Sequence, residues 1–276
     1  MPELPEVETI RRDLESRVVG CRFTGVTIPP DTGKPVPVLK GIDEAAFREG
    51  IAGARIEGVE RRGKYLALRL DSGDVLVVHL RMTGALLHRR PDDAPDRFVR
   101  AVLHLDDGTE LRFADLRKFG GFWLLEDIDA AASTGLGPEP LSEGFTVEGL
   151  ARSMAGRKAP VKSILLDQRH IAGIGNIYAD EACFAASIDP RRLGATLTPD
   201  EVAALHAAVQ SVLLFGVESR GASFKDYRDV AGESGSMHMY VKVFRRTGQP
   251  CYVCGMPIER VKLGGRSTHF CPHCQH

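Results

Sequence analysis

Apolar residues near the start of the chain recur at helical spacing. They lie three or four positions apart, on one face of a helix: Val7, Ile10, Leu14 and Val18. Gly20 follows the last of them and is a favourable stop signal. The pattern therefore predicts a helix over residues 5–19.

Between residues 22 and 125 the pattern changes to short stretches rich in β-branched and aromatic residues. Six of these stretches are expected to be strands: 22–28, 65–70, 75–80, 100–105, 110–113 and 121–125. Turn sequences such as Asp71-Ser-Gly-Asp and Asp106-Asp-Gly-Thr separate some of them. Many short strands joined by tight turns predict an antiparallel sandwich or barrel.

The second half of the chain has a helical pattern. Four helices are expected, over 147–155, 162–167, 177–186 and 199–217. The last begins with a capping box, Thr198 and Glu201, and has Pro199 at its first position. Its predicted buried stripe is Val202, Leu205, Val209, Val212 and Gly216.

These patterns predict an α+β protein of two domains. Residues 1–130 form an N-terminal antiparallel β domain, a sandwich or a barrel with flanking helices, and 131–146 form a linker without periodicity. Residues 147–236 form a helical domain, and 237–276 form a terminal hairpin with four cysteines.

Composition indicates an ordinary soluble protein. The chain has 276 residues, of which 43% are hydrophobic and 26% charged. No apolar run approaches membrane-spanning length and no signal peptide begins the chain, so we expect a cytoplasmic protein without membrane partners.

The net charge of −1 does not by itself indicate a nucleic-acid partner. From residue 237 onward, however, a single acid, Glu259, accompanies six basic residues: Lys242, Arg245, Arg246, Arg260, Lys262 and Arg266. A solvated basic end would give the same composition, but beside a cysteine hairpin we favour a phosphate-facing surface.

The cysteines of this hairpin have metal-ligand spacing. They follow the pattern Cys251-x2-Cys254-x16-Cys271-x2-Cys274, which can place four thiolates around one tetrahedral Zn²⁺. A pair of disulfides would need an oxidising compartment, which nothing else in the sequence indicates. We therefore predict one structural zinc ion.

The first residues carry candidate chemistry. Pro5, Glu6 and Glu8 suit a helix N-terminus, but Pro2 and Glu3 precede the helix. Removal of Met1 would expose the secondary amine of Pro2, which could attack an electrophilic carbon and form an iminium. The neighbouring carboxyl group of Glu3 could then transfer protons.

Three further segments are candidates for a function. Residues 61–65 lie at the start of a strand, and their plain interpretation is a solvated basic turn. Residues 172–176 contain a Gly-x-Gly sequence that leads into a helix N-terminus, where free N–H groups can bind phosphate. Residues 115–121 are either a charged hairpin or a side-chain wedge for a base stack.

Together these segments resemble the formamidopyrimidine-DNA glycosylases over essentially the whole chain. The matching motifs occur in order: the Pro-Glu-Leu-Pro-Glu-Val-Glu opening, Gly63-Lys-Tyr, His79-Leu-Arg-Met-Thr-Gly, Arg117-Lys-Phe-Gly, Gly135-Leu-Gly-Pro-Glu-Pro-Leu, the segment from Asp167 to Glu181, and the four-cysteine hairpin. The resemblance implies a β-sandwich, a helix-two-turn-helix domain and a zinc β-hairpin. It also implies an enzyme that removes oxidised purines from duplex DNA, cleaves the abasic strand and acts as a monomer.

The resemblance also implies roles for individual residues. Pro2 would be the nucleophile, Glu3 the general acid/base, and Lys64 and Arg266 would assist β- and δ-elimination. The residues expected to contact the DNA are Met82, Arg117 and Phe119, which fill the gap left by the flipped base, and Lys162 and Asn176, which hold the backbone. A second backbone contact, usually made by a lysine in the family, would come from Arg157 or Lys158.

Two positions depart from the family pattern. Phe98 stands where the family often has a phosphate-contacting histidine, so Arg97 or Arg100 would have to supply that contact. The segment 231–240 belongs to the loop that covers the flipped base in the family, and its divergence leaves the damage preference open.

Two alternatives remain at this level. An endonuclease VIII-type enzyme shares the mechanism but prefers oxidised pyrimidines, and Leu4 with the Met82, Arg117 and Phe119 set favours the purine branch. A non-enzymatic zinc-ribbon DNA-binding protein would not need the Pro2–Glu3 pair.

Overall fold

The computed structural model describes residues 1–30, 37–132 and 135–276 of the chain. Their contacts divide the molecule into two compact units. The first contains Met1–Ser133 and Ser219–Ser236, and the second contains Thr134–Glu218 and Met237–His276. Each unit is described by itself below.

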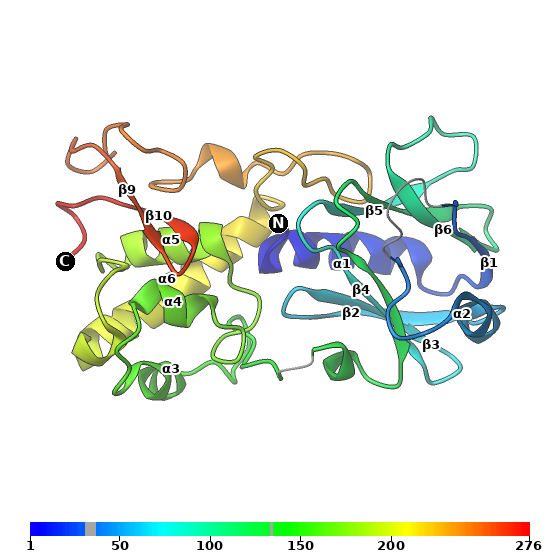
Figure 1. Cartoon of the computed structure of the whole chain (residues 1–276), viewed down its shortest axis with the longest axis horizontal. Coiled ribbons are helices and arrows are strands. Elements are labelled where there is room, and N and C mark those ends of the chain that lie inside the picture. Colours follow the sequence, from blue (N-terminus) through cyan, green and yellow to red (C-terminus); the bar gives the residue numbers. More distant parts are fainter. Residues whose placement is uncertain (31–36, 133–134) are drawn as a thin grey trace. The chain divides into compact units, whose positions relative to one another are not determined.

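Two antiparallel four-stranded sheets form the first unit (Figure 1). One sheet has the order β1-β6-β7-β5 and the other has the order β2-β3-β4-β8. The strands are β1 (Phe23–Thr27), β2 (Ile56–Arg62), β3 (Tyr65–Leu70), β4 (Val75–His79), β5 (Gly84–Arg89), β6 (Val99–Leu105), β7 (Glu110–Asp115) and β8 (Gly121–Leu125). The predicted antiparallel β-sandwich is confirmed.

The two sheets share one hydrophobic core with two helices, α1 (Leu4–Val18) and α2 (Glu44–Ile51). Phe113 of one sheet packs on Phe122 of the other, with ring centroids 5.0 Å apart. Helix α1 lies next to β2 and β3 (Figure 1) and buries its predicted stripe in this core. This packing places the first residues of the chain at a fixed position on the sandwich.

Strands β2 and β5 and helix α2 were not predicted. In β2 the buried residues Ile56 and Val59 lie three positions apart, which is a helical rather than an alternating spacing. A register shift between Ile56 and Gly58 explains it, because an extra residue there turns both side chains to the same face. In β5 the run Ala85-Leu-Leu gives no alternation either.

The second unit contains the predicted helices and the terminal hairpin. The helices are α3 (Val147–Met154), α4 (Val161–Leu166), α5 (Asn176–Ala185) and α6 (Pro199–Glu218), and the hairpin strands are β9 (Glu259–Leu263) and β10 (Arg266–Phe270). Short 3₁₀ turns cover Ile128–Ala131 in the first unit, and Gly194–Thr196 and Met237–Met239 in the second.

Helix α6 begins as predicted. The Glu201 carboxylate accepts the N–H of Thr198 at 2.7 Å, and the Thr198 hydroxyl accepts the N–H of Glu201 at 3.3 Å. The predicted stripe is buried except for Val212, which is half-buried, while Leu213 takes the core position.

By length and composition α6 could also cross a membrane, contrary to the sequence expectation. The core helix of a protein can have the same length and composition, and α6 packs against α3 and α5.

The segment Ser219–Ser236 follows α6 but packs with the sandwich. The sequence pattern had grouped it with the helices, within residues 147–236. Its Arg220 guanidinium pairs with Asp13 of α1, and the Arg89 guanidinium of β5 donates to the carbonyl oxygens of Val230 and Ala231. This segment is therefore a part of the surface on which the N-terminus lies.

Candidate active site

The second and third residues of the chain are buried at the start of α1. Pro2 is buried, and Glu3 is only 2% exposed and occupies the N-cap position. The Glu3 carboxylate accepts the backbone N–H of Glu6, and the Glu6 carboxylate accepts the N–H of Glu3 at 2.7 Å. This reciprocal pair fixes a carboxylate directly beside the second residue of the chain.

Glu6 also ties this end to the segment after α6. Its second oxygen accepts the N–H of Ala222 at 2.7 Å, and its carbonyl oxygen accepts the Tyr227 hydroxyl at 3.3 Å. Glu6 is 1% exposed, so both carboxylate bonds are shielded from water. The first helical turn, which often frays, is held here by a residue 216 positions away in the chain.

Lys64 lies at the turn between β2 and β3 and is 8% exposed. The Arg61 guanidinium donates to the carbonyl oxygen of Gly63 at 3.1 Å and pairs with Glu8 of α1 at 3.1 Å. This bridge joins the turn to the helix that carries Pro2 and Glu3. A buried ammonium group on a rigid turn is suited to contact with an anionic group.

His79 was not selected from the sequence, although it lies in a matching motif. It is opposite Tyr65 in the register of β3 and β4, and burial lowers its pKa to about 3, assisted by the charges of Arg81 and Lys64. The N–H of Arg81 donates to its Nδ1 at 2.9 Å, so the ring proton is on Nε2. His79 is therefore a neutral hydrogen-bond donor near Lys64.

Met82, Arg117 and Phe119 are brought together on the first unit. Met82 and Phe119 are exposed by 40% and 49%, and the Arg117 guanidinium lies 4.8 Å from the centre of the Phe119 ring. Arg117 also donates to the Met82 sulfur at 3.0 Å. Two exposed apolar side chains joined by a cation have the character of a wedge for a base stack.

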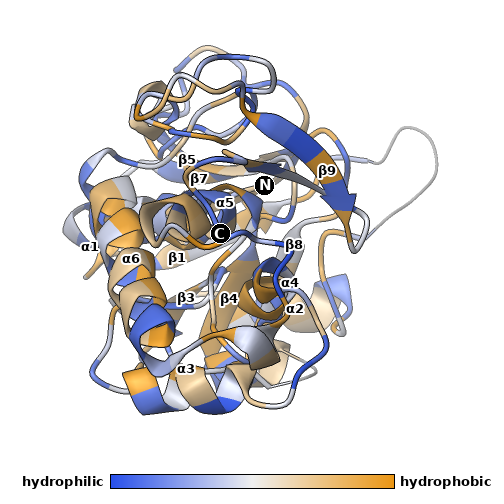
Figure 2. Ribbon diagram, turned by 90° about the vertical axis from the view of Figure 1, so that its left-hand side faces the viewer, coloured by the Kyte–Doolittle hydropathy of each residue, from blue (hydrophilic) through white to orange (hydrophobic). Residues whose placement is uncertain are grey.

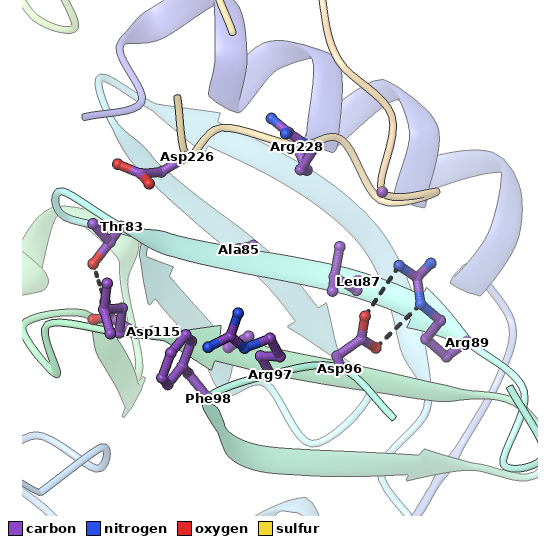
Figure 3. Close-up of a pocket in the computed structure, with 13 residues that line it drawn as sticks. Thr83, Ala85, Leu87, Arg89, Asp96, Arg97, Phe98, Asp115, Asp226 and Arg228 are labelled. Atoms are coloured by element: carbon purple, nitrogen blue, oxygen red, sulfur yellow. Dashed lines mark hydrogen bonds and ion pairs between the residues drawn. The ribbon is translucent and has the colours of Figure 1, made fainter. Parts of the chain in front are cut away.

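Asp115 organises the turn that carries this wedge. It is 1% exposed and accepts the N–H of Arg117 at 3.0 Å and that of Gly120 at 2.8 Å. The Thr83 hydroxyl also donates to it (Figure 3). The turn includes Lys118 in a left-handed conformation with φ of 60°, which Asp115 helps to maintain.

A pocket of about 270 Å³ lies over β5 and β7, beside the segment after α6 (Figure 3). Phe98 lines it and is 47% exposed, in a left-handed conformation with φ of 62°. The guanidinium of the exposed Arg97 lies 5.0 Å from its ring centre, whereas Arg100 is half-buried in β6. Of the two arginines, Arg97 is the exposed one.

In the second unit, Asn176 and Arg266 lie at neighbouring positions. Asn176 begins α5, whose N-cap residue Gly175 offers no side-chain cap, and its Nδ2 donates to the carbonyl oxygen of Ser267 at 3.0 Å. Arg266 is the adjacent residue and is exposed after the Gly264-Gly265 turn. A helix N-terminus next to an amide and a guanidinium is a suitable phosphate site.

The environment of Lys162 differs from the sequence expectation of a direct contact with the DNA backbone. Its side chain is completely buried, and Nζ contacts Asp180 at 2.6 Å and the carbonyl oxygen of Ser267 at 2.7 Å. It cannot hold the DNA backbone directly, so this assignment was wrong. Arg157, in contrast, is exposed and remains available, with Nε donating to the Ser153 carbonyl oxygen at 2.7 Å.

The four hairpin cysteines form the predicted metal site. Their Sγ atoms all lie within 4.8 Å of one another, with Cys251 to Cys274 at 3.9 Å and Cys254 to Cys271 at 3.4 Å. A tetrahedral Zn²⁺ with bonds of about 2.3 Å requires sulfur separations of about 3.8 Å. The residues fit one structural zinc ion, and four thiolates leave no open position for a substrate.

The zinc hairpin carries basic residues on an exposed strand. Strand β9 contains Arg260 and Lys262 and is largely hydrophilic along its length (Figure 2). It pairs with β10 in register, so that Arg266 lies opposite Leu263. The metal site therefore stabilises a two-stranded arm that presents cations.

Three family models match the chain. The formamidopyrimidine-DNA glycosylase N-terminal domain matches residues 1–122, the formamidopyrimidine-DNA glycosylase H2TH domain matches residues 136–228, and the zinc finger found in FPG and IleRS matches residues 248–276.

Full-length relatives agree with these matches. A formamidopyrimidine-DNA glycosylase of Symbiobacterium thermophilum is 50% identical over 100% of this chain and 89% of the relative. The crystal structure of the Thermus thermophilus protein has a TM-score of 0.87 at 40% identity, covering 99% of this chain and 98% of that one. The Lactococcus lactis protein bound to abasic DNA has a TM-score of 0.90 at 31% identity, covering 99% of both chains. By sequence, fold and site, the chain belongs to the formamidopyrimidine-DNA glycosylase family.

Proposed function

We propose that this protein excises oxidised purines from duplex DNA and cleaves the resulting abasic strand, with Pro2 as the nucleophile. The observation that carries the proposal is the buried Glu3 carboxylate, fixed beside Pro2 by the capping box with Glu6. A non-enzymatic DNA-binding protein would have no need for a carboxylate held next to a chain-terminal amine.

The chemistry begins with a free secondary amine. Removal of Met1 exposes the Pro2 nitrogen, whose pKa as an α-amine is near 8, so that a useful fraction is neutral. The amine forms a bond to C1′ of the sugar while the bond from C1′ to the base breaks, and the base leaves with a proton. Glu3 is the group placed to supply and remove protons during sugar-ring opening to the iminium.

The covalent intermediate leads to strand cleavage. The iminium acidifies the C2′ proton, and its removal expels the phosphate on the 3′ side by β-elimination. Lys64 is proposed to bind the phosphate at the lesion and to assist this proton transfer. Arg266 is proposed to assist the subsequent δ-elimination, which releases the phosphate on the 5′ side.

Contacts with the DNA backbone and base stack support the chemistry. Extrusion of a base costs a few kcal/mol, and insertion of Met82, Arg117 and Phe119 would offset part of that cost. Asn176 and Arg157 are proposed to bind backbone phosphates. We add His79 to the proposed phosphate contacts, because it is a neutral donor near Lys64.

The proposed substrates follow from the relatives. The Lactococcus lactis protein was solved with DNA containing an abasic site, and another related structure contains carbocyclic 8-oxo-G DNA. These ligands favour 8-oxoguanine, formamidopyrimidines and abasic sites in duplex DNA as substrates here. We further propose that the protein acts as a monomer in the cytoplasm, and that residues 1–130 and 237–276 are functional domains as predicted. The helical domain that begins at residue 147 is proposed to end at residue 218 instead of 236, because residues 219–236 pack with the sandwich.

Borohydride trapping tests the proposal directly. The untagged protein should become covalently linked to a duplex with 8-oxoguanine opposite cytosine, and peptide mapping should place the adduct on Pro2. A matched duplex containing thymine glycol should give much less adduct. A preference for thymine glycol would instead favour the endonuclease VIII-type alternative, and an adduct on Lys64 would refute Pro2 as the nucleophile.

A further inference from the structure

A buried ionic cluster lies beneath the proposed phosphate site of the second unit. Asp180 of α5 is completely buried, and Lys162 and His269 are buried beside it. The Lys162 ammonium contacts one Asp180 oxygen at 2.6 Å. The other Asp180 oxygen accepts the backbone N–H of His269 at 3.0 Å and lies 3.1 Å from the His269 ring Nδ1.

The cluster is connected to the surface through one carbonyl group. The carbonyl oxygen of Ser267 accepts hydrogen bonds from Lys162 Nζ at 2.7 Å and from Asn176 Nδ2 at 3.0 Å. A carbonyl oxygen has two lone pairs, so these two donors saturate it. The Asn176 amide group has a second N–H. The hydrogen bond from the first N–H to Ser267 fixes the direction of the second.

Arg266 is held by the same contacts. It directly precedes Ser267 in β10, and the N–H of His269, two residues further on, is bound by Asp180. The strand is thus fixed at Ser267 and at His269, while the Arg266 side chain remains exposed. Asp180, although remote from solvent, is therefore connected to Arg266 through the backbone of β10, and to Asn176 through Lys162 and the Ser267 carbonyl group.

Stability alone does not account for this cluster. Burial of two charges costs several kcal/mol each, and apolar residues of similar volume often give an equal or greater stability. The contact that an apolar replacement would lose is the bond from Lys162 Nζ to the Ser267 carbonyl oxygen. That bond is useful if Asn176 and Arg266 must meet a phosphate at fixed positions.

We propose that Asp180 is a positioning residue for DNA phosphate binding, acting through Lys162 and the Ser267 carbonyl group on Asn176 and Arg266. This inference rests on the proposed function, in which Asn176 and Arg266 contact the backbone. It assigns to the buried Lys162 an indirect role in place of the direct contact expected from the sequence.

The test compares Asp180→Asn with the double variant Asp180→Asn/Lys162→Met. Each full-length, zinc-loaded protein is titrated with a duplex containing a tetrahydrofuran abasic analogue at several salt concentrations. The single variant should unfold at a lower temperature and bind about 10- to 100-fold more weakly, since a shift of about 1 Å is enough to disturb a contact site. The slope of its log affinity against log salt concentration should decrease by the amount expected for about one phosphate contact. Its zinc content should be unchanged.

The double variant separates positioning from stability. It removes both buried charges, so its unfolding temperature should recover, but its binding and salt dependence should not, because the bond from Lys162 to Ser267 is absent. Recovery of binding together with stability would overturn the proposal, as would normal binding by the single variant. Glu201→Gln, which alters a partly exposed ion pair with Arg192 in the same unit, is the control and should bind normally.

Arg266→Ala distinguishes failure of this inference from failure of the proposed function. Weak binding by Arg266→Ala with normal binding by Asp180→Asn would refute only the positioning role. Normal binding by Arg266→Ala would refute the phosphate contact on which the inference rests.

Discussion

The buried carboxylate of Asp115 accepts the backbone N–H of Gly120 at 2.8 Å, closing the turn that carries Arg117 and Phe119. The same side chain also accepts the Thr83 hydroxyl and the N–H of Arg117. One acidic residue thus links the turn to Thr83, which directly follows Met82. The wedge depends on this residue for its shape, although Asp115 itself is inaccessible.

We expect Asp115→Asn to slow excision of 8-oxoguanine by roughly tenfold. An amide offers one acceptor oxygen where the carboxylate offers two, so a buried N–H loses its partner at a cost of about 1–3 kcal/mol. Single-turnover excision and chemical unfolding would measure the two effects. Cleavage of a pre-formed abasic site should change less, and equal losses on both substrates would show that the turn is not specific to base extrusion.

Phe119→Ala should affect the wedge without disturbing the turn. Phosphate contacts dominate nonspecific binding, so affinity for undamaged duplex should be nearly unchanged. Excision of a stacked lesion should slow more than processing of an abasic site, where no base has to be unstacked. If the two reactions slow equally, Phe119 has no part in unstacking.

An uncleaved N-terminal extension should abolish base excision and strand cleavage while DNA binding survives. The extension converts the Pro2 nitrogen to an amide, which has no nucleophilic lone pair. Mass spectrometry of the purified protein establishes whether Met1 or the tag is present. A C-terminally tagged protein is the control, and full activity of the intact N-terminally extended protein would exclude the Pro2 mechanism.

His79 should remain neutral well below the ordinary histidine range. Its pKa is about 3 in the folded protein against 6.5 in the unfolded chain, so between these values the unfolded chain binds the extra proton. This residue therefore lowers the free energy of unfolding as the pH falls from about 6.5 toward about 3. NMR of the imidazole at pH 5 should show the Nε2–H tautomer, and His79→Gln should reduce the acid sensitivity of unfolding.

Loss of zinc should weaken DNA binding while the β-sandwich stays folded. Cys254→Ser removes one of four thiolates, and the arm carrying Arg260, Lys262 and Arg266 should loosen as a result. Metal analysis would measure the zinc bound by the hairpin, and thermal unfolding would show whether the β-sandwich stays folded. A wild-type preparation with full activity but without about one equivalent of zinc would contradict this role.

The sequence predicted features in which local pattern and final environment agree. The cysteine spacing, the stripe of α1 and the capping box of α6 all depend on residues close in the chain, and each is found in the structure. Strand β2 was missed because a bulge places Ile56 and Val59 on one face, which mimics a helical spacing.

The site was less predictable where burial decides the role. Lys162 has the charge of a DNA contact, but only the folded structure places Asp180 beside it and removes it from solvent. His79 lay in a matching motif, yet its significance depends on cross-strand neighbours. The position of Ser219–Ser236 on the sandwich follows from contacts with residues more than a hundred positions earlier.

The bond between Glu6 and Ala222 has a consequence for the order of events during synthesis. The ribosome produces the first helix and all eight strands of the sandwich long before residue 222. Until then the Glu6 carboxylate lacks one of its two backbone partners, and the first turn of the nascent chain is held only by its own capping box. We therefore expect the amino end to stay open to enzymes that trim Met1 during most of translation. The bond to Ala222 can form only when slightly more than four-fifths of the polypeptide has been made.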